Sequence, residues 1–145
     1  MALVTFTNNQ APYLSAENLN NNFEYLDEKI DNGEIYSTQE IKTNKKWING
    51  KTIYKKVIDY GYLPNANYKD VSSGLTDVLV HKIYGYAISP NNTTIPLPFA
   101  TTSANNNVSL VYTDLNYIRT QTGTDRSTQY AYIVIEYTKT TDEEE

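Results

Sequence analysis

Near its C-terminal end the chain reads Tyr130-Ala131-Tyr132-Ile133-Val134-Ile135-Glu136-Tyr137-Thr138-Lys139. Side chains alternate between the two faces of a β-strand, so this run divides into two sets. One face carries Tyr130, Tyr132, Val134 and Glu136, and the other carries Ala131, Ile133, Ile135 and Tyr137. Both sets are largely apolar, which is expected when both faces of a strand are covered. The run therefore predicts a central strand of a β-sheet.

Upstream of this strand, short apolar runs alternate with turn signals. The strongest signal is Asn49-Gly50 between apolar flanks, which predicts a β-hairpin over residues 47–60. Further strands are predicted at residues 78–88, 108–112 and 114–118. Residues 95–99 are predicted to be extended, and their prolines confine them to an edge strand or a crossing segment. Several short strands bounded by turns are typical of a β-sandwich. The expected fold class is mainly β, with a β-sandwich or jelly-roll-like head at residues 34–141.

The regions between and beyond these strands are expected to be less regular. Residues 34–46 are interpreted as a connector or a first edge strand, and residues 61–70 as a loop because they hold Pro64 and several Asn and Asp residues. Residues 138–145 form a polar tail that ends in the acidic run 142–145. We expect this tail to be frayed, as chain ends commonly are.

The N-terminal segment, residues 1–33, has a different pattern. Ser15 is a good N-cap, and Asn32-Gly33 is a typical helix stop. Between them the apolar residues recur at spacings of three and four, with nearly all other positions polar. The apolar positions are Ala16, Leu19, Phe23, Leu26 and Ile30. This narrow heptad seam predicts a short coiled-coil-like helix that associates with other copies of the chain.

Two alternatives remain for this helix. An ordinary amphipathic helix could instead lie on the surface of its own head. The mixture of Leu, Phe and Ile in the seam does not select two, three or more strands. A helix of about 16 residues is marginal alone, so contacts elsewhere must help to hold an oligomer together.

The composition of the 145-residue chain excludes several classes of site. It has no cysteine, so disulfides and thiolate metal sites are ruled out, and its single histidine, His81, argues against a metal site. We expect no cofactor. The net charge of -5 is spread evenly, which argues against nucleic acid as a partner, and the few clustered lysines are interpreted as solvated edge-strand residues. We also expect no secretory signal and no membrane insertion, because no apolar run is long enough.

Aromatic and amide residues suggest one candidate binding site. Trp47, the only tryptophan, lies beside Asn49, and Tyr54 follows in the same hairpin. Aromatic faces and amide groups are what a carbohydrate ligand needs, so these three residues are candidate glycan contacts. The alternative is that Trp47 simply anchors the packing of the hairpin.

A second candidate pair is Asp125 and Arg126, in the loop before the last strand. An Asp in such a loop usually caps the turn, and the Arg pairs locally. The alternative is an inter-subunit pair that fixes the register of an oligomer. No carboxylate pair, triad or phosphate loop forms a recognisable motif, so no catalytic residues are expected and the chain is not expected to be an enzyme.

Several stretches resemble a domain found at the C-terminal end of many phage tail and particle proteins. They are Tyr36-Ser37-Thr38-Gln39-Glu40, Lys46-Trp47-Ile48-Asn49-Gly50-Lys51-Thr52-Ile53-Tyr54-Lys55-Lys56, Thr94-Ile95-Pro96-Leu97-Pro98-Phe99 and Thr122-Gly123-Thr124-Asp125-Arg126-Ser127, with the last strand after them. The segment from Phe6 to Asn20, which contains Asn18-Leu19-Asn20, is similar to the N-terminal segment of many phage fibre proteins.

The resemblance implies a virion protein, assembled in the host cytoplasm. Such proteins are typically homotrimers that attach to another virion protein by the N-terminus and display a β-structured head. This chain lacks the long shaft of typical fibres, so a short head fibre, a capsid decoration protein or a small adaptor fits its length. The alternatives are a receptor-binding module for a host cell-surface glycan and, as the weakest, a depolymerase fragment.

Overall fold

The structure, a computed structural model, describes residues 19–21 and 35–144. Residues 19–21 are α-helical, and the Leu19 side chain is 40% exposed. The other seam residues, Ala16, Phe23, Leu26 and Ile30, lie outside the described residues, so the coiled-coil-like helix stays a prediction. Within the described part of the chain, no helix is long and apolar enough to cross a membrane.

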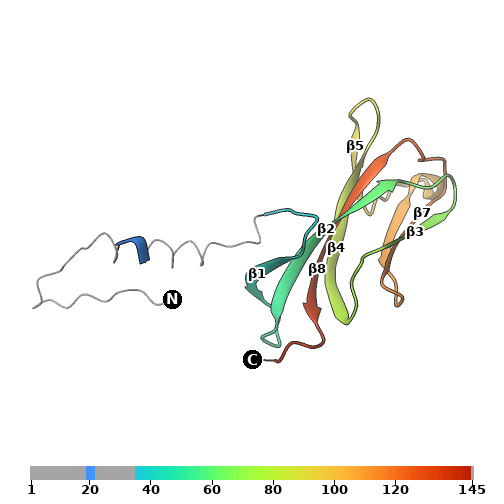
Figure 1. Cartoon of the computed structure of the whole chain (residues 1–145). Coiled ribbons are helices and arrows are strands. Elements are labelled where there is room, and N and C mark those ends of the chain that lie inside the picture. Colours follow the sequence, from blue (N-terminus) through green and yellow to red (C-terminus); the bar gives the residue numbers. More distant parts are fainter. Residues whose placement is uncertain (1–18, 22–34, 145) are drawn as a thin grey trace, which may run out of the picture.

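The described head is mainly β, as predicted, and contains two antiparallel sheets (Figure 1). The larger sheet has the strand order β1-β2-β8-β4-β5 and the smaller sheet the order β3-β7-β6. The elements are β1 (Ile41–Lys46), β2 (Thr52–Tyr62), β3 (Tyr68–Ser72), β4 (Val78–Ile88), β5 (Thr94–Leu97), the 3-10 turn η2 (Ala104–Asn106), β6 (Val108–Tyr112), β7 (Tyr117–Thr122) and β8 (Tyr130–Lys139).

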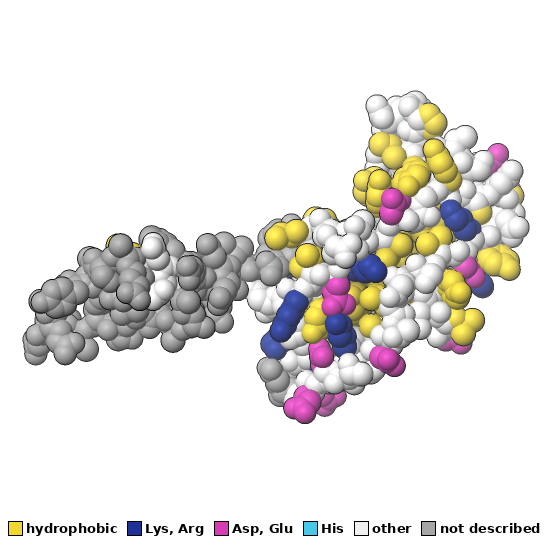
Figure 2. Space-filling model, in the orientation of Figure 1, with side chains coloured by type: hydrophobic (Ala, Val, Ile, Leu, Met, Phe, Trp, Pro, Cys, Tyr) yellow, Lys and Arg dark blue, Asp and Glu magenta, His cyan; other side chains and the backbone are white. Residues whose placement is uncertain are grey.

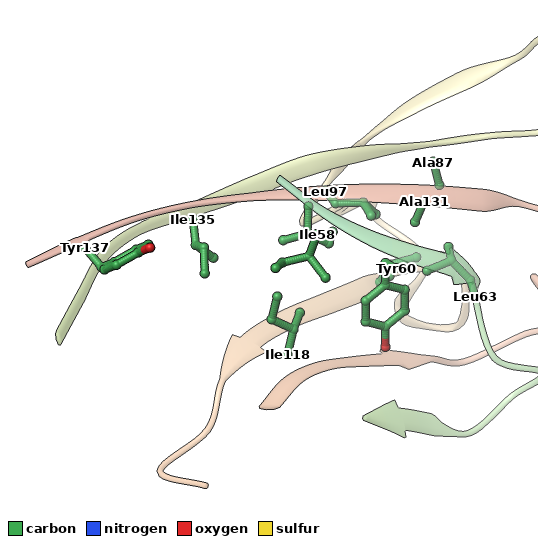
Figure 3. Close-up of a cluster of buried hydrophobic side chains, with 11 residues drawn as sticks. Ile58, Tyr60, Leu63, Ala87, Leu97, Ile118, Ala131, Ile135 and Tyr137 are labelled. Carbon is green, nitrogen blue, oxygen red and sulfur yellow. The ribbon is translucent and has the colours of Figure 1, made fainter. Parts of the chain in front are cut away.

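The prediction that the last strand is central is confirmed. β8 lies between β2 and β4, and β5 is an edge strand, one of the two alternatives that its prolines left open. The face of β8 with Ile133, Ile135 and Tyr137 is fully buried. Figure 3 shows Ile58 and Ile135 of the larger sheet pointing toward Ile118 of the smaller sheet. The core therefore fills the space between the two sheets.

Tyr60 joins the two sheets at one point of this core. The β2–β8 pairing shifts register between Asp59 and Gly61, and Gly61 adopts a positive φ of 83°. Next to this bulge the Tyr60 side chain is buried, and its hydroxyl lies 2.6 Å from the Lys69 carbonyl oxygen and 2.8 Å from Thr120 Oγ1. Both partners belong to the smaller sheet, so one phenol group connects β2 to β3 and β7.

The hairpin at Asn49-Gly50 is present, but its turn is longer than predicted. β1 ends at Lys46, and the Trp47 N–H donates to the Lys51 carbonyl over 2.9 Å. Gly50 adopts a φ of 82°, a conformation that glycine reaches at little cost. Trp47 is therefore part of the turn and does not belong to the incoming strand.

The expectation of a frayed tail is wrong for residues 138–144. Thr138 and Lys139 belong to β8, and beyond them the Tyr54 hydroxyl donates to Asp142 over 3.0 Å. The Asn49 side-chain amide lies 3.4 Å from the Glu144 carboxylate. The tail folds back on the β1–β2 hairpin, and Figure 2 shows acidic side chains at this end of the head.

Candidate functional site

The outer face of the larger sheet is rich in tyrosine. Tyr130 and Tyr132 alternate with the buried residues of β8, so both project to the side away from the core. Tyr62 of β2 lies opposite Tyr130, and Tyr86 of β4 lies opposite Tyr132. The register therefore places four tyrosines, Tyr62, Tyr130, Tyr132 and Tyr86, across three neighbouring strands; we call them the tyrosine row.

Each ring of the tyrosine row contacts the next. Ring centroids are 5.0 Å apart for Tyr62 and Tyr130, in an edge-to-face arrangement, and 5.5 Å apart for Tyr130 and Tyr132. The centroids of Tyr132 and Tyr86 are 5.9 Å apart. These are favourable separations for aromatic pairs. The two ends of the row stay open to solvent, since Tyr62 is 56% and Tyr86 is 42% exposed.

A hydrogen bond from Tyr130 fixes the middle of the row. Its hydroxyl donates to Asp59 Oδ1 over 2.6 Å. This hydrogen bond, with some burial, raises the pKa of Tyr130 to about 12, because an ionised phenolate would lie beside the carboxylate. The Tyr130 ring therefore stays neutral across the physiological range.

A groove of about 500 Å³ adjoins the row at Tyr132 and Tyr86. Val57 and Val134 line it from β2 and β8. The segment 36–38, which precedes β1, bounds it on one side: the Ser37 carbonyl accepts a hydrogen bond of 2.9 Å from the Val57 N–H. We call this feature the tyrosine groove.

Tyr36 is held in place at the border of the groove. Lys55 Nζ lies 3.9 Å from the centre of the Tyr36 ring, in cation–π geometry, and the Lys55 residue is only 3% exposed. Tyr36 also shares a hydrogen bond with Tyr84 of β4. Burial, together with this bond, raises the pKa of Tyr84 well above its ordinary value. The Tyr36 side chain therefore reaches from the β2 side of the sheet to β4.

The lining of the groove has a distinctive chemistry. Of the nine described residues that line it, six carry a hydroxyl group and none is an acid or a base of the Asp, Glu, Lys, Arg or His type. The hydroxyl-bearing residues are Tyr36, Ser37, Thr38, Tyr84, Tyr86 and Tyr132. Aromatic faces with a few polar groups are typical of ligand sites. The groove can therefore hold an uncharged ligand that has both apolar faces and hydrogen-bonding groups.

The structure places the predicted glycan contacts elsewhere and does not bring them together. Trp47 is 36% exposed and stacks on His81, with ring centroids 3.9 Å apart and an interplanar angle of 17°. His81 Nε2 in turn lies 2.9 Å from Thr138 Oγ1, and burial lowers the pKa of His81. Trp47 thus packs on His81 beside the central strand, as the packing-anchor alternative expects, and its role as a glycan contact stays a prediction.

Asn49 and Tyr54 are also occupied by structural contacts. The Asn49 side chain accepts a hydrogen bond from the Lys51 N–H over 3.1 Å, which shapes the turn. Tyr54 packs against the core, with its ring centroid 6.0 Å from that of Tyr137. Tyr137 and Thr138 point to opposite faces of β8, so Tyr54 and Trp47 lie on opposite faces of the sheet. The three residues do not form one platform.

Asp125 and Arg126 have separate partners within the chain. Asp125 Oδ1 accepts the Ser127 N–H over 2.9 Å, and this local interaction lowers the pKa of Asp125. Arg126 donates to Gln129 Oε1 over 3.1 Å and also to the Asn106 carbonyl oxygen. These are the local roles that the loop suggested, and the inter-subunit pair stays a prediction.

Sequence reasoning placed Tyr130 and Tyr132 on one face of β8, but it expected both faces to be covered and did not find the groove. The alternation of residues 130–136 gave their face, whereas Tyr36, Tyr84 and Tyr86 meet them only through long-range pairing of strands. No group of three His, Cys, Asp or Glu that could hold a metal ion occurs among residues 19–21 and 35–144. Comparison of the chain with protein-family models, curated proteins and solved structures gives no match.

Proposed function

We propose that this chain is a phage virion structural protein: a short trimeric fibre or decoration protein. Its N-terminal segment binds another virion protein, its heptad seam forms a coiled-coil-like stem, and its jelly-roll-like β-sandwich head is displayed. Resemblance to phage particle proteins and the seam pattern at residues 16–30 support this proposal. The protein assembles in the host cytoplasm and functions in the virion, with no enzymatic role.

One observation of the structure supports the proposed display role. The tyrosine row and groove form a shaped, aromatic surface on the outside of the larger sheet. Tyrosine is enriched at protein and ligand interfaces because it offers a large contact area with few rotatable bonds. Segment 36–38, through which the N-terminal part of the chain joins the head, borders this surface. The head thus has a surface on the larger sheet that suits contacts with a protein or a ligand.

The solution mass of seam variants tests the trimeric stem. Light scattering on the 16.5 kDa chain should give a mass of about three chains. The double variant Phe23→Asn/Leu26→Asn should shift the mass toward one chain, because it places amides in the seam. Glu24→Gln/Asp27→Asn changes neighbouring residues outside the seam and should keep the oligomer. Equal masses for all three proteins would contradict the stem.

A second candidate function is favoured by the lining of the groove. A receptor-binding module for a host cell-surface glycan needs exposed aromatic faces beside hydroxyl groups. The tyrosine groove has both, and its lining lacks charged side chains. Binding of the full-length protein to intact host cells, measured by flow cytometry and compared with Tyr86→Ala, tests this role. Equal binding of the two proteins would contradict a receptor role for this face.

A further inference from the structure

We propose that the tyrosine groove, continued by the tyrosine row, binds a neutral oligosaccharide of several sugar units. This inference rests on the second candidate function and names its ligand class and its site. The residues concerned are Tyr36, Tyr84, Tyr86 and Tyr132, with the hydroxyl groups of Ser37 and Thr38 beside them. The hairpin residues Trp47, Asn49 and Tyr54 take no part.

The aromatic rings supply the apolar half of the site. A pyranose ring has one or two faces made of C–H groups, and these faces pack on the face of an aromatic ring. Tyr86 and Tyr132 border the groove with their ring planes inclined by 36°, so the two rings do not cover each other completely. Tyr86 is 42% exposed, so its ring is more accessible than that of Tyr132.

The hydroxyl groups supply the polar half. Six of the nine lining residues carry a hydroxyl that can both donate and accept hydrogen bonds. Sugar hydroxyls have the same dual capacity, so each group can adapt to its partner. A purely apolar ligand would leave these groups without partners, which costs free energy at each of them.

The charges around the groove favour a neutral ligand. Asp59 is engaged by Tyr130, and Glu136 lies 3.6 Å from Lys82 Nζ. Lys55 is almost completely buried beneath the Tyr36 ring. Lys82 Nζ is an exposed cation beside the groove, 5.0 Å from the centre of the Tyr84 ring, but it already pairs with Glu136. A uronic or sialic acid would therefore lose hydration and would have to compete with Glu136 for this ion pair.

The site is built before the ligand arrives. Tyr36 is fixed by Lys55 and Tyr84, and the backbone of segment 36–38 is hydrogen-bonded to β2. Rings that are already ordered lose little conformational entropy on binding. The row from Tyr132 to Tyr62 extends the aromatic surface beyond the groove, which matches a chain of sugars better than a monosaccharide.

Titration calorimetry on the full-length protein tests the inference. The probes are oligomers of four to six units of glucose, galactose, mannose and N-acetylglucosamine, with oligogalacturonate as the anionic counterpart. At least one neutral oligomer should bind, and oligogalacturonate should not. Tyr86→Ala should weaken the binding by about tenfold or more, whereas Tyr86→Phe, which keeps the ring, should retain most of it.

Matched controls separate the possible failures. Tyr117→Ala removes an exposed tyrosine of the smaller sheet and should bind like the wild type. Thermal unfolding confirms that each variant is folded. Binding of the anionic oligomer alone, or no binding by any neutral oligomer, would overturn the inference. A drop in solution mass for Tyr86→Ala would also overturn it, because the face would then be an interface between copies.

The receptor role can be judged apart from the ligand class. If Tyr86→Ala loses attachment to host cells while every neutral oligomer fails to bind, the receptor role stands and the neutral ligand is wrong. If the neutral oligomers bind while cell attachment is unaffected by Tyr86→Ala, the site stands and the receptor role is wrong.

Discussion

Glu40 shows how single side chains fasten the end of the head. Its carboxylate accepts hydrogen bonds from the Tyr137 hydroxyl over 2.5 Å and from Lys139 Nζ over 2.7 Å. Partial burial acts to raise the pKa of Glu40, but the hydrogen bonds from Lys139 and Tyr137 outweigh it and lower the pKa. Segment 36–40 is thereby tied to Tyr137 and Lys139 at the end of β8.

The lowered pKa of Glu40 predicts a pH dependence of stability. A carboxyl group with a depressed folded-state pKa stabilises the fold above its unfolded pKa of about 4.3, and this contribution is lost as pH falls through the folded value. The free energy of unfolding of the wild type, measured with urea, should therefore decrease as pH falls from about 5 to 3. Glu40→Gln should lose less stability over this interval. Equal losses of stability in the wild type and in Glu40→Gln would contradict the assignment of this pH dependence to Glu40.

Gly85 predicts a second effect at the scale of one residue. A Cβ atom added there would lie 2.2 Å from the Tyr132 carbonyl oxygen, which belongs to the backbone of the neighbouring strand. Gly85→Ala must push β4 away from β8, at a cost of about 1–3 kcal/mol. Denaturant unfolding should show this loss, while Ser109→Ala, at an exposed strand position, should be nearly neutral. Unchanged stability of Gly85→Ala would contradict this close approach.

At the scale of elements, the hydroxyl of Tyr60 links the two sheets. In Tyr60→Phe the buried hydroxyl of Thr120 and the Lys69 carbonyl would lose a partner. Leaving such groups unpaired costs about 1–3 kcal/mol, so we expect a lower urea midpoint. Tyr117→Phe removes a hydroxyl from an exposed ring and should leave the midpoint unchanged. If the two variants behaved alike, the link between the sheets would be unimportant.

The predictability of the elements follows from how local their signals are. β8, β4 and the hairpin carry alternation and Asn-Gly within their own sequences, so they were predicted. β3 was missed because its residues follow Pro64 and several Asn and Asp residues, and it becomes a strand only by pairing with β7 about 50 residues later. The tail was predicted as frayed because its partners, Tyr54 and Asn49, lie far back in the chain.

The same reasoning applies to the candidate site. Period-two alternation places Tyr130 and Tyr132 on one face of β8, but the apolar character of both faces predicted that this face is covered as well. Their neighbours Tyr86 and Tyr62 depend on strand register, and Tyr36 depends on a connector that lies alongside β2. Trp47 and Tyr54 were grouped because they are close in sequence, but strand alternation places them on opposite faces of the sheet. The groove therefore required the three-dimensional arrangement.

At the scale of the whole molecule, we propose an N-terminal stem and a head whose tyrosine face stays open. If so, contacts between heads use other surfaces, and the row and groove remain accessible in the proposed oligomer. Tyr137 is fully buried in the same strand that carries Tyr132, so it can serve as the protected control when the exposure of the tyrosine face is measured.

Hydroxyl-radical footprinting of the full-length oligomer, read residue by residue by mass spectrometry, tests this central claim most directly. We predict rapid labelling of Tyr36 and Tyr86, which are 62% and 42% exposed, and protection of Tyr137. Protection of Tyr36 and Tyr86 to the level of Tyr137 in the oligomer would contradict the account, because the tyrosine face would then be covered by another copy of the chain.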